Sequence, residues 1–258
     1  MSPGTSGAAP PARWLLIGSS RWHWASPCGE AELALWHSAP ASGPVGEAGS
    51  QLLAWAAVGA VPEGAALPAA RRLSPAAVPL RAAPPWLGID RALAGWQAWR
   101  SVGGAVLVAD AGTVLSLTRV DREGAFAGGR LLAGVALQWR AMAEGTTSLP
   151  ALDPAERAAL AAPEPPDPWP SATAAAMASG VVLGLAAAVA EGFSEARALD
   201  PHCRLLLTGG DGPALEGPLR RRLAAAGLEG RLALRPALAL EGLAALAPVQ
   251  ARPRSVRI

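Results

Sequence analysis

Short apolar runs alternate with small polar turns along most of the chain. Residues 14–17 form an apolar run, residues 18–20 are small, and residues 21–25 alternate between polar and apolar positions. An apolar strand, a turn of small residues and a returning strand predict a β-hairpin. The same device recurs over residues 105–120. Because each hairpin begins about half of the chain, we predict two similarly built halves, each with a turn that could hold phosphate.

Helical spacing and further apolar runs follow both hairpins. We predict helices at 30–36, 90–99, 132–144, 172–193, 213–226 and 238–247, buried strands at 204–207 and 231–234, and mixed strand and helix pieces at 51–60 and 65–78. Strands that alternate with helices indicate an α/β protein. We place a disordered leader at 1–12, the two halves at 13–103 and 104–250, and a basic tail at 251–258.

The predicted helix at 172–193 raises the question of a membrane. Residues 172–190 carry no charge, and a segment of this length could cross a bilayer. However, the segment is rich in weakly apolar alanine and ends at Glu191 without a basic flank. Gly180 and Gly184 would let a neighbouring element pack closely, so we expect a buried helix and no membrane insertion.

Composition excludes several kinds of chemistry. The sequence has no lysine and no tyrosine, so all 22 basic residues are arginine. A Walker-type phosphate loop, a protein kinase and a Schiff-base enzyme each need a lysine, and all three are excluded. The net charge is only +2 and the arginines are spread along the chain, so we expect no nucleic-acid partner. Two distant cysteines and three histidines give no disulfide framework and no zinc spacing, which fits a cytoplasmic protein.

Three turns and one acidic residue hold most of the candidate chemistry. The turns at 18–21, 110–113 and 208–211 each combine glycine with polar side chains, and each could contact phosphate or also be an ordinary turn. Asp90 precedes a helical segment, where it could cap the helix or act as a general base. Arg91 beside it could hold an anionic substrate group by a bidentate contact.

Together these segments resemble the type III pantothenate kinases. The shared motifs, in order, are Gly88-Ile89-Asp90-Arg91, Asp110-Ala111-Gly112-Thr113, Gly128-Gly129 with residues 131–134, residues 145–150, residues 173–180, and Thr208-Gly209-Gly210-Asp211. The resemblance covers residues 14–248. It implies an α/β fold of two duplicated ribonuclease-H-like halves around a central nucleotide cleft, as in actin-like ATPases, sugar kinases and Hsp70.

The resemblance also implies an activity and a site. ATP would phosphorylate pantothenate to 4'-phosphopantothenate, the first step of coenzyme A biosynthesis, with Mg2+ and with K+ or NH4+, in a homodimer. Asp90 would be the catalytic base, and Asp110 would bind the monovalent cation. Pantothenate would contact Gly88, Ile89, Asp90, Arg91 and Thr173. ATP would contact Leu16, Ile17, Gly18, Ser19, Ser20, Arg21, Trp22, His23, Thr113, Gly209 and Gly210.

The first turn departs from the family pattern. Leu16 stands where the family has aspartate, Ser19 where it has asparagine, and His23 where it has lysine. Leucine offers no oxygen to a metal ion. The alternative to an active kinase is therefore a catalytically degenerate homologue that binds nucleotide or pantothenate and acts through a partner protein. A third hypothesis is a kinase of the same superfamily with another small hydroxylated acceptor.

Overall fold

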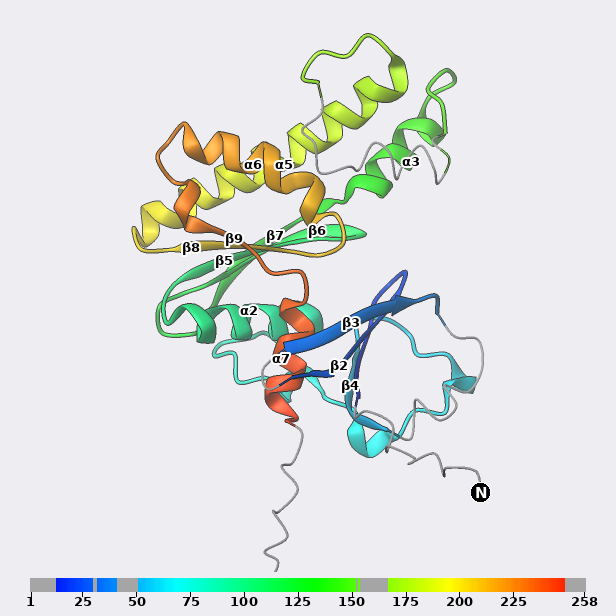
Figure 1. Cartoon of the computed structure of the whole chain (residues 1–258), viewed down its shortest axis with the longest axis vertical. Coiled ribbons are helices and arrows are strands. Elements are labelled where there is room, and N and C mark those ends of the chain that lie inside the picture. The colour runs from blue at the N-terminus through cyan, green and yellow to red at the C-terminus, as the bar shows by residue number, and fades with distance from the viewer. Residues whose placement is uncertain (1–12, 30–31, 41–50, 152, 154–166, 249–258) are drawn as a thin grey trace, which may run out of the picture. The chain divides into compact units, whose positions relative to one another are not determined.

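The chain forms two compact units in a computed structural model that describes residues 13–29, 32–40, 51–151, 153 and 167–248 (Figure 1). The first unit comprises residues 1–77 and 240–258, and the second comprises residues 78–239. The predicted leader and basic tail lie outside the described residues.

The first unit is built on a four-stranded sheet. Its strands are β1 (Arg13–Ile17), β2 (Trp22–Cys28), β3 (Glu32–Ser38) and β4 (Leu52–Ala57), in the order β3-β2-β1-β4. Strands β1, β2 and β3 are antiparallel neighbours, and β4 is parallel to β1. The hairpin predicted at 14–25 is therefore confirmed.

The helix predicted at 30–36 is wrong over its described part, because residues 32–38 form strand β3. Leucine and alanine favour a helix here, but cross-strand contacts to β2 override that preference. The indole ring of Trp36 stacks on that of Trp24, with 6.0 Å between the ring centroids and 5° between the planes. Such aromatic pairs are a main source of sheet stability.

Both faces of this sheet are covered by segments of the first unit. One face carries Leu15, Ile17, Trp22 and Trp55, which pack with Ala65 of a short 3-10 helix. Further 3-10 helices at Ala69–Arg71 and Pro75–Ala77 follow, so residues 65–78 contain short helical turns and no strand. On the other face, the indole N–H of Trp14 donates to the Ala247 carbonyl at 2.9 Å. Ala247 directly follows helix α7 (Leu238–Leu246).

The second unit repeats the strand order of the first. Its strands are β5 (Val106–Ala111), β6 (Val114–Val120), β7 (Phe126–Ala133), β8 (Arg204–Thr208) and β9 (Leu232–Leu234), in the order β7-β6-β5-β8-β9. Strands β5, β6 and β7 are antiparallel neighbours, and β8 is parallel to β5. Three antiparallel strands followed by a parallel one thus occur in both units, and the duplication predicted from the two hairpins is confirmed.

Helices cover both faces of the second sheet (Figure 1). Helix α2 (Ile89–Val102) lies on one face, where the α-carbon of Gly95 approaches Val120 and Thr118 of β6. On the other face, Leu107 and Leu117 belong to a core that includes side chains of α5 (Thr173–Leu199) and α6 (Gly212–Ala224). Helix α3 (Val135–Gly145) packs on α5 through Trp139, and a 3-10 helix at Glu229–Arg231 precedes β9.

Two predicted boundaries differ from these elements. The helix predicted at 132–144 begins at Val135, because residues 132–133 still pair with β6 as the end of β7. The predicted division between the halves lies at residue 103, whereas the compact units divide at residue 77. The reason for the second difference is the packing of α2, whose contacts with β5 and β6 place it in the second unit.

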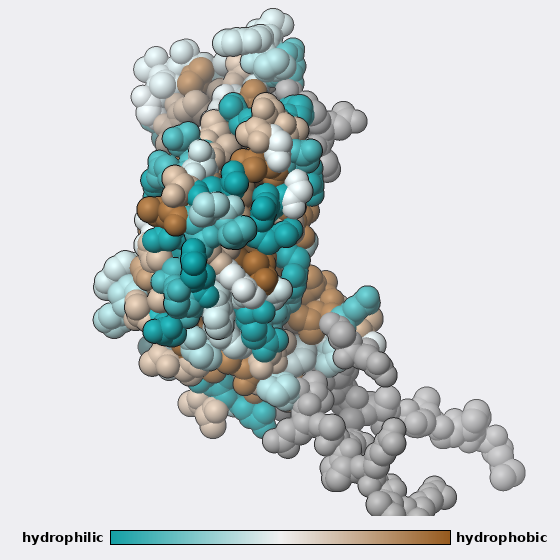
Figure 2. Space-filling view, turned by 90° about the vertical axis from the view of Figure 1, so that its left-hand side faces the viewer, coloured by the Kyte–Doolittle hydropathy of each residue, from teal (hydrophilic) through white to brown (hydrophobic). Residues whose placement is uncertain are grey.

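Helix α5 is long and apolar enough to cross a membrane, with a mean hydropathy of 1.9 over its most apolar window. It is, however, part of the core of the second unit, where Val182, Ala186, Val189 and Phe193 are almost fully buried. On the face seen in Figure 2, hydrophilic residues are interspersed among hydrophobic ones instead of leaving one continuous hydrophobic band. The burial of these side chains agrees with the predicted buried helix. The close packing predicted at Gly180 and Gly184 is wrong, because both glycines are exposed and a Cβ at either would meet no described atom within 4 Å.

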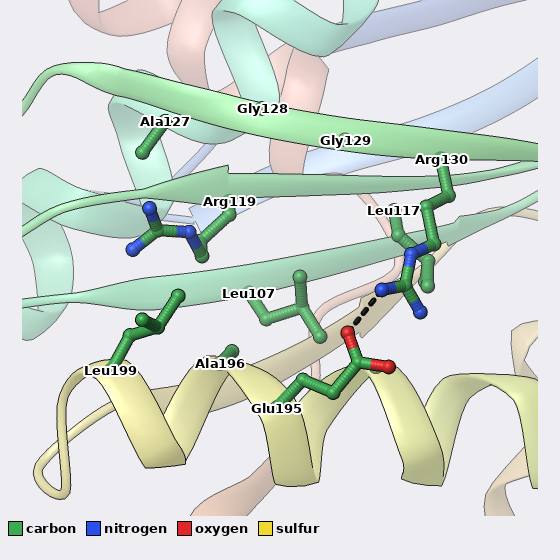
Figure 3. A pocket seen from close by; sticks show the side chains of 11 residues that line it. Leu107, Leu117, Arg119, Ala127, Gly128, Gly129, Arg130, Glu195, Ala196 and Leu199 are labelled. Carbon is green, nitrogen blue, oxygen red and sulfur yellow. Dashed lines mark hydrogen bonds and ion pairs between the residues drawn. The ribbon is translucent and has the colours of Figure 1, made fainter.

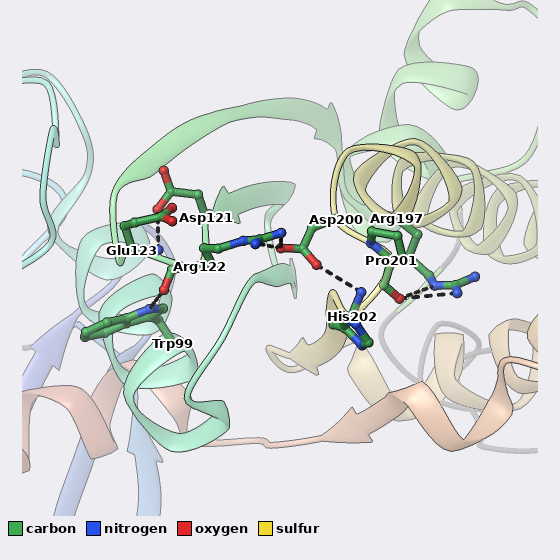
Figure 4. A network of polar contacts seen from close by, with 8 residues as sticks. All are labelled: Trp99, Asp121, Arg122, Glu123, Arg197, Asp200, Pro201 and His202. Atoms are coloured by element: carbon green, nitrogen blue, oxygen red, sulfur yellow. Dashed lines mark hydrogen bonds and ion pairs between the residues drawn. The ribbon is translucent and has the colours of Figure 1, made fainter.

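A polar clamp joins the turn after β6 to the corner between α5 and β8 (Figure 4). The Asp200 carboxylate, whose side chain is 10% exposed, accepts hydrogen bonds from the His202 backbone N–H at 2.9 Å and from Arg122 Nε at 3.1 Å. The indole of Trp99 in α2 donates to the Arg122 carbonyl at 3.0 Å. The N–H of His202, followed by Arg122, lowers the pKa of Asp200.

This clamp predicts a pH-dependent loss of stability in Asp200→Asn. A carboxyl group with a lowered folded-state pKa stabilises the fold above its ordinary pKa, and the stabilisation is lost as pH falls through the folded value. We expect Asp200→Asn to melt several degrees below the parent near neutral pH, and the difference to shrink toward about pH 3. Thermal unfolding at both pH values tests this. Glu216→Gln, which breaks an exposed pair with Arg220, is the control, and equal melting of parent and Asp200→Asn would contradict the prediction.

Candidate active site

Two turns meet at the carboxyl ends of β5 and β8 in the second unit. The N–H of Asp211 donates to the Ala111 carbonyl at 2.8 Å, which ties the turn at 208–211 to the turn at 110–113. Gly209 has φ +88°, and a Cβ there would collide with the Ala111 carbonyl and the Asp110 carboxylate. Only glycine fits this position, both for its backbone conformation and for the space available. The turn that carries Asp110 and Thr113 thus lies against the turn that carries Gly209 and Gly210.

Asp110 lies among oxygen atoms on the face of the sheet that α2 covers. It pairs with Ser116 across β6 and with Thr208 across β8, and directly opposed residues share a face of the sheet. Ser116 and Thr208 are buried. A carboxylate with two neighbouring hydroxyl groups offers oxygen ligands of the kind that hard cations prefer. Among the described residues, no group of three or more His, Cys, Asp or Glu side chains could hold a metal ion.

Asp90 lies close enough to Asp110 for their charges to interact. It is the second residue of α2, whose N-cap is Gly88, so Asp90 is not the capping residue. Its Oδ1 accepts the Arg91 backbone N–H at 2.8 Å. Burial raises the pKa of Asp90, and burial together with the charge of Asp90 raises the pKa of Asp110 to about 7. A partly buried carboxylate with a raised pKa is suited to accept a proton near neutral pH.

Arg91 is held by three residues of β6 and β7. Its Nε donates to Thr118 Oγ1 at 3.0 Å, and its guanidinium lies 5.9 Å from the centroid of the Phe126 ring. A Cβ at Gly129 would collide with Arg91 Nη2 and with the Leu117 carbonyl. These contacts hold the guanidinium in one position.

Sequence analysis missed the roles of Thr118 and Phe126. The available signal was the alternation along β6, which places Thr118 and Ser116 on the same face of the strand. The Gly128-Gly129 pair was part of the family resemblance, but only the structure shows that Gly129 makes room for Arg91.

The first turn belongs to the first unit. The Gly18 N–H donates to the Arg21 carbonyl at 2.9 Å and closes the turn, which leaves Ser19, Ser20 and Arg21 exposed. Of the other predicted nucleotide contacts, Leu16, Ile17 and Trp22 are buried, with Ile17 and Trp22 in the core. Side chains of these three residues stabilise the hairpin, so only the exposed part of the turn can meet a ligand.

His23 cannot replace the charge of the family lysine. It pairs with Leu16 across β1 and with His37 across β3. Burial, followed by the nearby His37 and Arg21, lowers the pKa of His23 to about 4. The imidazole is therefore neutral near pH 7.

Thr173 is not brought to Asp90 and Arg91 within the second unit. It is the exposed first residue of α5, and α5 covers the face of the sheet opposite α2. A cavity of about 310 Å³ also lies on that opposite face, where Arg130 pairs with Glu195 (Figure 3). None of the predicted site residues lines this cavity.

The raised pKa of Asp110 predicts a pH window for stability. An acid whose pKa rises on folding stabilises the fold while it is protonated, and this contribution is lost between the ordinary pKa of 3.8 and about 7. We expect Asp110→Asn to be more stable than the parent above this window, by about 1 to 3 kcal/mol in potassium-free buffer. Urea unfolding from acid to weakly alkaline pH measures the difference. It should disappear in acid, and a difference that does not vary with pH would contradict the prediction; Glu144→Gln, an exposed carboxylate, is the control.

Comparison with known proteins points to one family. The family model for type III pantothenate kinase matches residues 72–195, a stretch that includes Asp90 and Asp110. A type III pantothenate kinase from Thermosynechococcus vestitus is 38% identical over 211 residues, which are 80% of this chain and 80% of that protein. Another, from Synechococcus sp. (strain JA-3-3Ab), is 38% identical over 236 residues, which are 90% of this chain and 91% of that protein.

Solved structures agree on the fold. A conserved protein from Campylobacter jejuni, described as belonging to a Baf family of transcriptional activators, has a TM-score of 0.57 at 15% identity and covers 91% of this chain and 96% of its own. A ROK family glucokinase from Streptomyces griseus, in complex with glucose and AMPPNP, has a TM-score of 0.50 at 14% identity. The match covers 92% of this chain and 99% of the glucokinase chain. The predicted α/β fold class, shared with actin-like ATPases and sugar kinases, is confirmed. With relatives more than one third identical over most of both chains, this chain belongs to the type III pantothenate kinase family.

Proposed function

We propose that this protein uses ATP to phosphorylate the primary hydroxyl of pantothenate, which yields 4'-phosphopantothenate, the first step of coenzyme A biosynthesis. The observation that supports this most directly is the juxtaposition of Asp90, Asp110 and an immobilised Arg91 beside the glycine turn at 208–211. The family membership of the chain supports the same activity.

Asp90 acts as the general base in this proposal. Phosphoryl transfer asks mainly for alignment of the acceptor hydroxyl with the phosphate and for neutralisation of charge. The Asp90 carboxylate accepts the hydroxyl proton as the hydroxyl oxygen bonds to the γ-phosphorus of ATP, while the bond from that phosphorus to the bridging oxygen breaks and ADP leaves. Its raised pKa makes it a better proton acceptor than an exposed aspartate.

Arg91 binds the pantothenate carboxylate through its Nη groups, with Gly88 and Ile89 beside it at the start of α2. Thr173 is proposed to complete the acceptor site. Because α5 begins on the opposite face of the sheet from α2, we propose that Thr173 reaches the site of a second subunit in a homodimer.

Nucleotide binding is assigned to Thr113, to Gly209 and Gly210, and to the exposed part of the first turn. Gly210 lies just before α6, whose free N–H groups and helix dipole favour phosphate. In a chain without lysine, backbone amides and arginines such as Arg21 supply the positive field.

The donor atoms present fit a monovalent cation better than a directly bound Mg2+. Asp110 with the hydroxyls of Ser116 and Thr208 would hold K+ or NH4+, which would help to neutralise phosphate charge. At the family's aspartate position, the buried Leu16 offers no oxygen. We therefore expect Mg2+ to arrive with ATP and to be held chiefly by its phosphates. We also propose a cytoplasmic location, without nucleic-acid or membrane partners.

Leu16 is also the observation that favours the alternative, a degenerate homologue that binds nucleotide or pantothenate and acts through a partner protein. The kinase hypothesis and the degenerate-homologue hypothesis predict different turnover. The purified full chain, assayed with ATP, Mg2+ and pantothenate, with and without K+, should form phosphopantothenate if the kinase reading is right. ATP binding without any turnover would favour the alternative. Turnover of another hydroxylated acceptor in preference to pantothenate would favour the third hypothesis.

Asp90→Asn should lower the turnover number by at least about 100-fold. Asparagine has nearly the same shape as aspartate but cannot take the proton. Steady-state rates with saturating ATP and pantothenate measure the loss, and Glu123→Gln, an exposed carboxylate of the same unit, should behave like the parent. Undiminished turnover in Asp90→Asn would remove Asp90 as the base.

Thr118→Val should raise the KM for pantothenate about tenfold or more and change the turnover number less. Valine keeps the shape of this fully buried side chain but leaves Arg91 Nε without its acceptor. Thr118→Ser retains the hydroxyl and should restore a KM close to that of the parent. A Thr118→Val enzyme with the parent's KM, or a serine variant as impaired as the valine variant, would show that the hydrogen bond does not position Arg91.

A further inference from the structure

The end of strand β3 lies beside the first turn and forms a hollow with it. Ser20 and Arg21 of the turn, together with His37, Ser38 and Ala39, line a space of about 380 Å³. The strand register explains this proximity, because Trp22 pairs with Ser38 and His23 pairs with His37. The pairing of β3 with β2 thus places His37 and Ser38 next to the turn, although they follow it by about fifteen residues in the sequence.

The two histidines share one proton between their facing nitrogens. Nδ1 of His23 lies 3.0 Å from Nδ1 of His37, and the rings meet edge to face. A hydrogen bond between them requires that one Nδ1 carries a proton and that the other accepts it. In a neutral pair, the accepting ring carries its own proton on Nε2. The accepting ring therefore keeps one N–H donor, on its Nε2.

His37 is the ring that can offer this donor to a ligand. His23 is partly buried, and its Nε2 is turned toward Gly18, 3.0 Å from the position that a Cβ would take there. His37 is exposed and lines the hollow, and with Nδ1 engaged by His23 its remaining nitrogen is Nε2. When His23 donates, His37 keeps its proton on Nε2 and can give it to an acceptor in the hollow.

The charge in the hollow favours an anion. Arg21 is an exposed guanidinium, and none of the described residues that line the space is acidic. A guanidinium with an imidazole N–H suits phosphate oxygens, which accept several charge-assisted hydrogen bonds. A metal cation is disfavoured between the same two histidines, because Arg21 already acts electrostatically on His23.

We propose that His37 is a phosphate-binding residue, which donates its Nε2 hydrogen to the phosphate chain of a nucleoside triphosphate while Arg21 neutralises the charge. This inference rests on the proposed function for the identity of the ligand, and it extends the nucleotide site from the first turn to β3. His23 then acts as a positioning residue, since its Nδ1–H holds the His37 ring in the donating tautomer.

The test uses the full chain and two probes, ATP and inorganic tripolyphosphate, with binding measured by isothermal titration calorimetry. His37→Ala should weaken both ligands about tenfold or more, the usual effect of losing a hydrogen bond to a charged group. His37→Gln places an amide N–H near the position of Nε2 and should recover much of the affinity. His37→Asn places it near Nδ1 and should not. His202→Ala changes the remaining histidine, which lies in the second unit, and should bind like the parent.

Parallel kinase assays separate this inference from the proposed function. A raised KM for ATP with an unchanged KM for pantothenate in His37→Ala supports both. If the parent phosphorylates pantothenate but His37→Ala binds tripolyphosphate and ATP as tightly as the parent, the His37 site is wrong and the kinase stands. If affinity depends on His37 but the parent makes no phosphopantothenate, the anion site stands and the proposed kinase is wrong. A parent that binds no tripolyphosphate overturns the His37 site.

Discussion

The packing of helix α2 against strands β5 and β6 is the contact on which the candidate site depends. Gly95 has no side chain, so the helix approaches β6 until its α-carbon region meets Val120 and Thr118. This approach brings the first turn of α2, with Asp90 and Arg91, to the polar face of the sheet. A larger residue at position 95 would need Val120 or Thr118 to shift, because a Cβ there would lie 3.2 Å from Val120.

Close packing also creates the electrostatics of the site. Two carboxylates that are withdrawn from water near each other cannot both ionise at their ordinary pKa. Asp110, the next-to-last residue of the buried strand β5, therefore titrates near neutrality unless a cation compensates for its charge. The same arrangement that costs stability in the free protein is what suits these carboxylates to the cation and the proton of the proposed reaction.

Much of the fold and part of the candidate site could be predicted from the sequence, for reasons that differ between elements. The two hairpins and the β8 turn carry strong local signals, since apolar runs end at glycine-containing turns. The helix prediction for segment 32–38 is wrong because its leucine and alanine residues favour a helix. The stacking of Trp36 on Trp24 stabilises a strand instead, and it depends on a neighbouring strand that local sequence does not reveal. In the same way, the contacts of Thr118 and Phe126 with Arg91 could not be predicted, because they depend on how α2 packs on the sheet. His37 also acquires its place from the register of β2 with β3 and carries no sequence signal of its own.

The first unit is assembled from two parts of the chain that are separated by the whole second unit. Its strands lie between residues 13 and 57, yet Trp14 finds its partner at Ala247. During synthesis the amino-terminal sheet is made long before the segment that covers one of its faces. The face that carries Trp14 therefore stays uncovered while the ribosome makes the second unit, and during this period the nascent chain has most need of a chaperone.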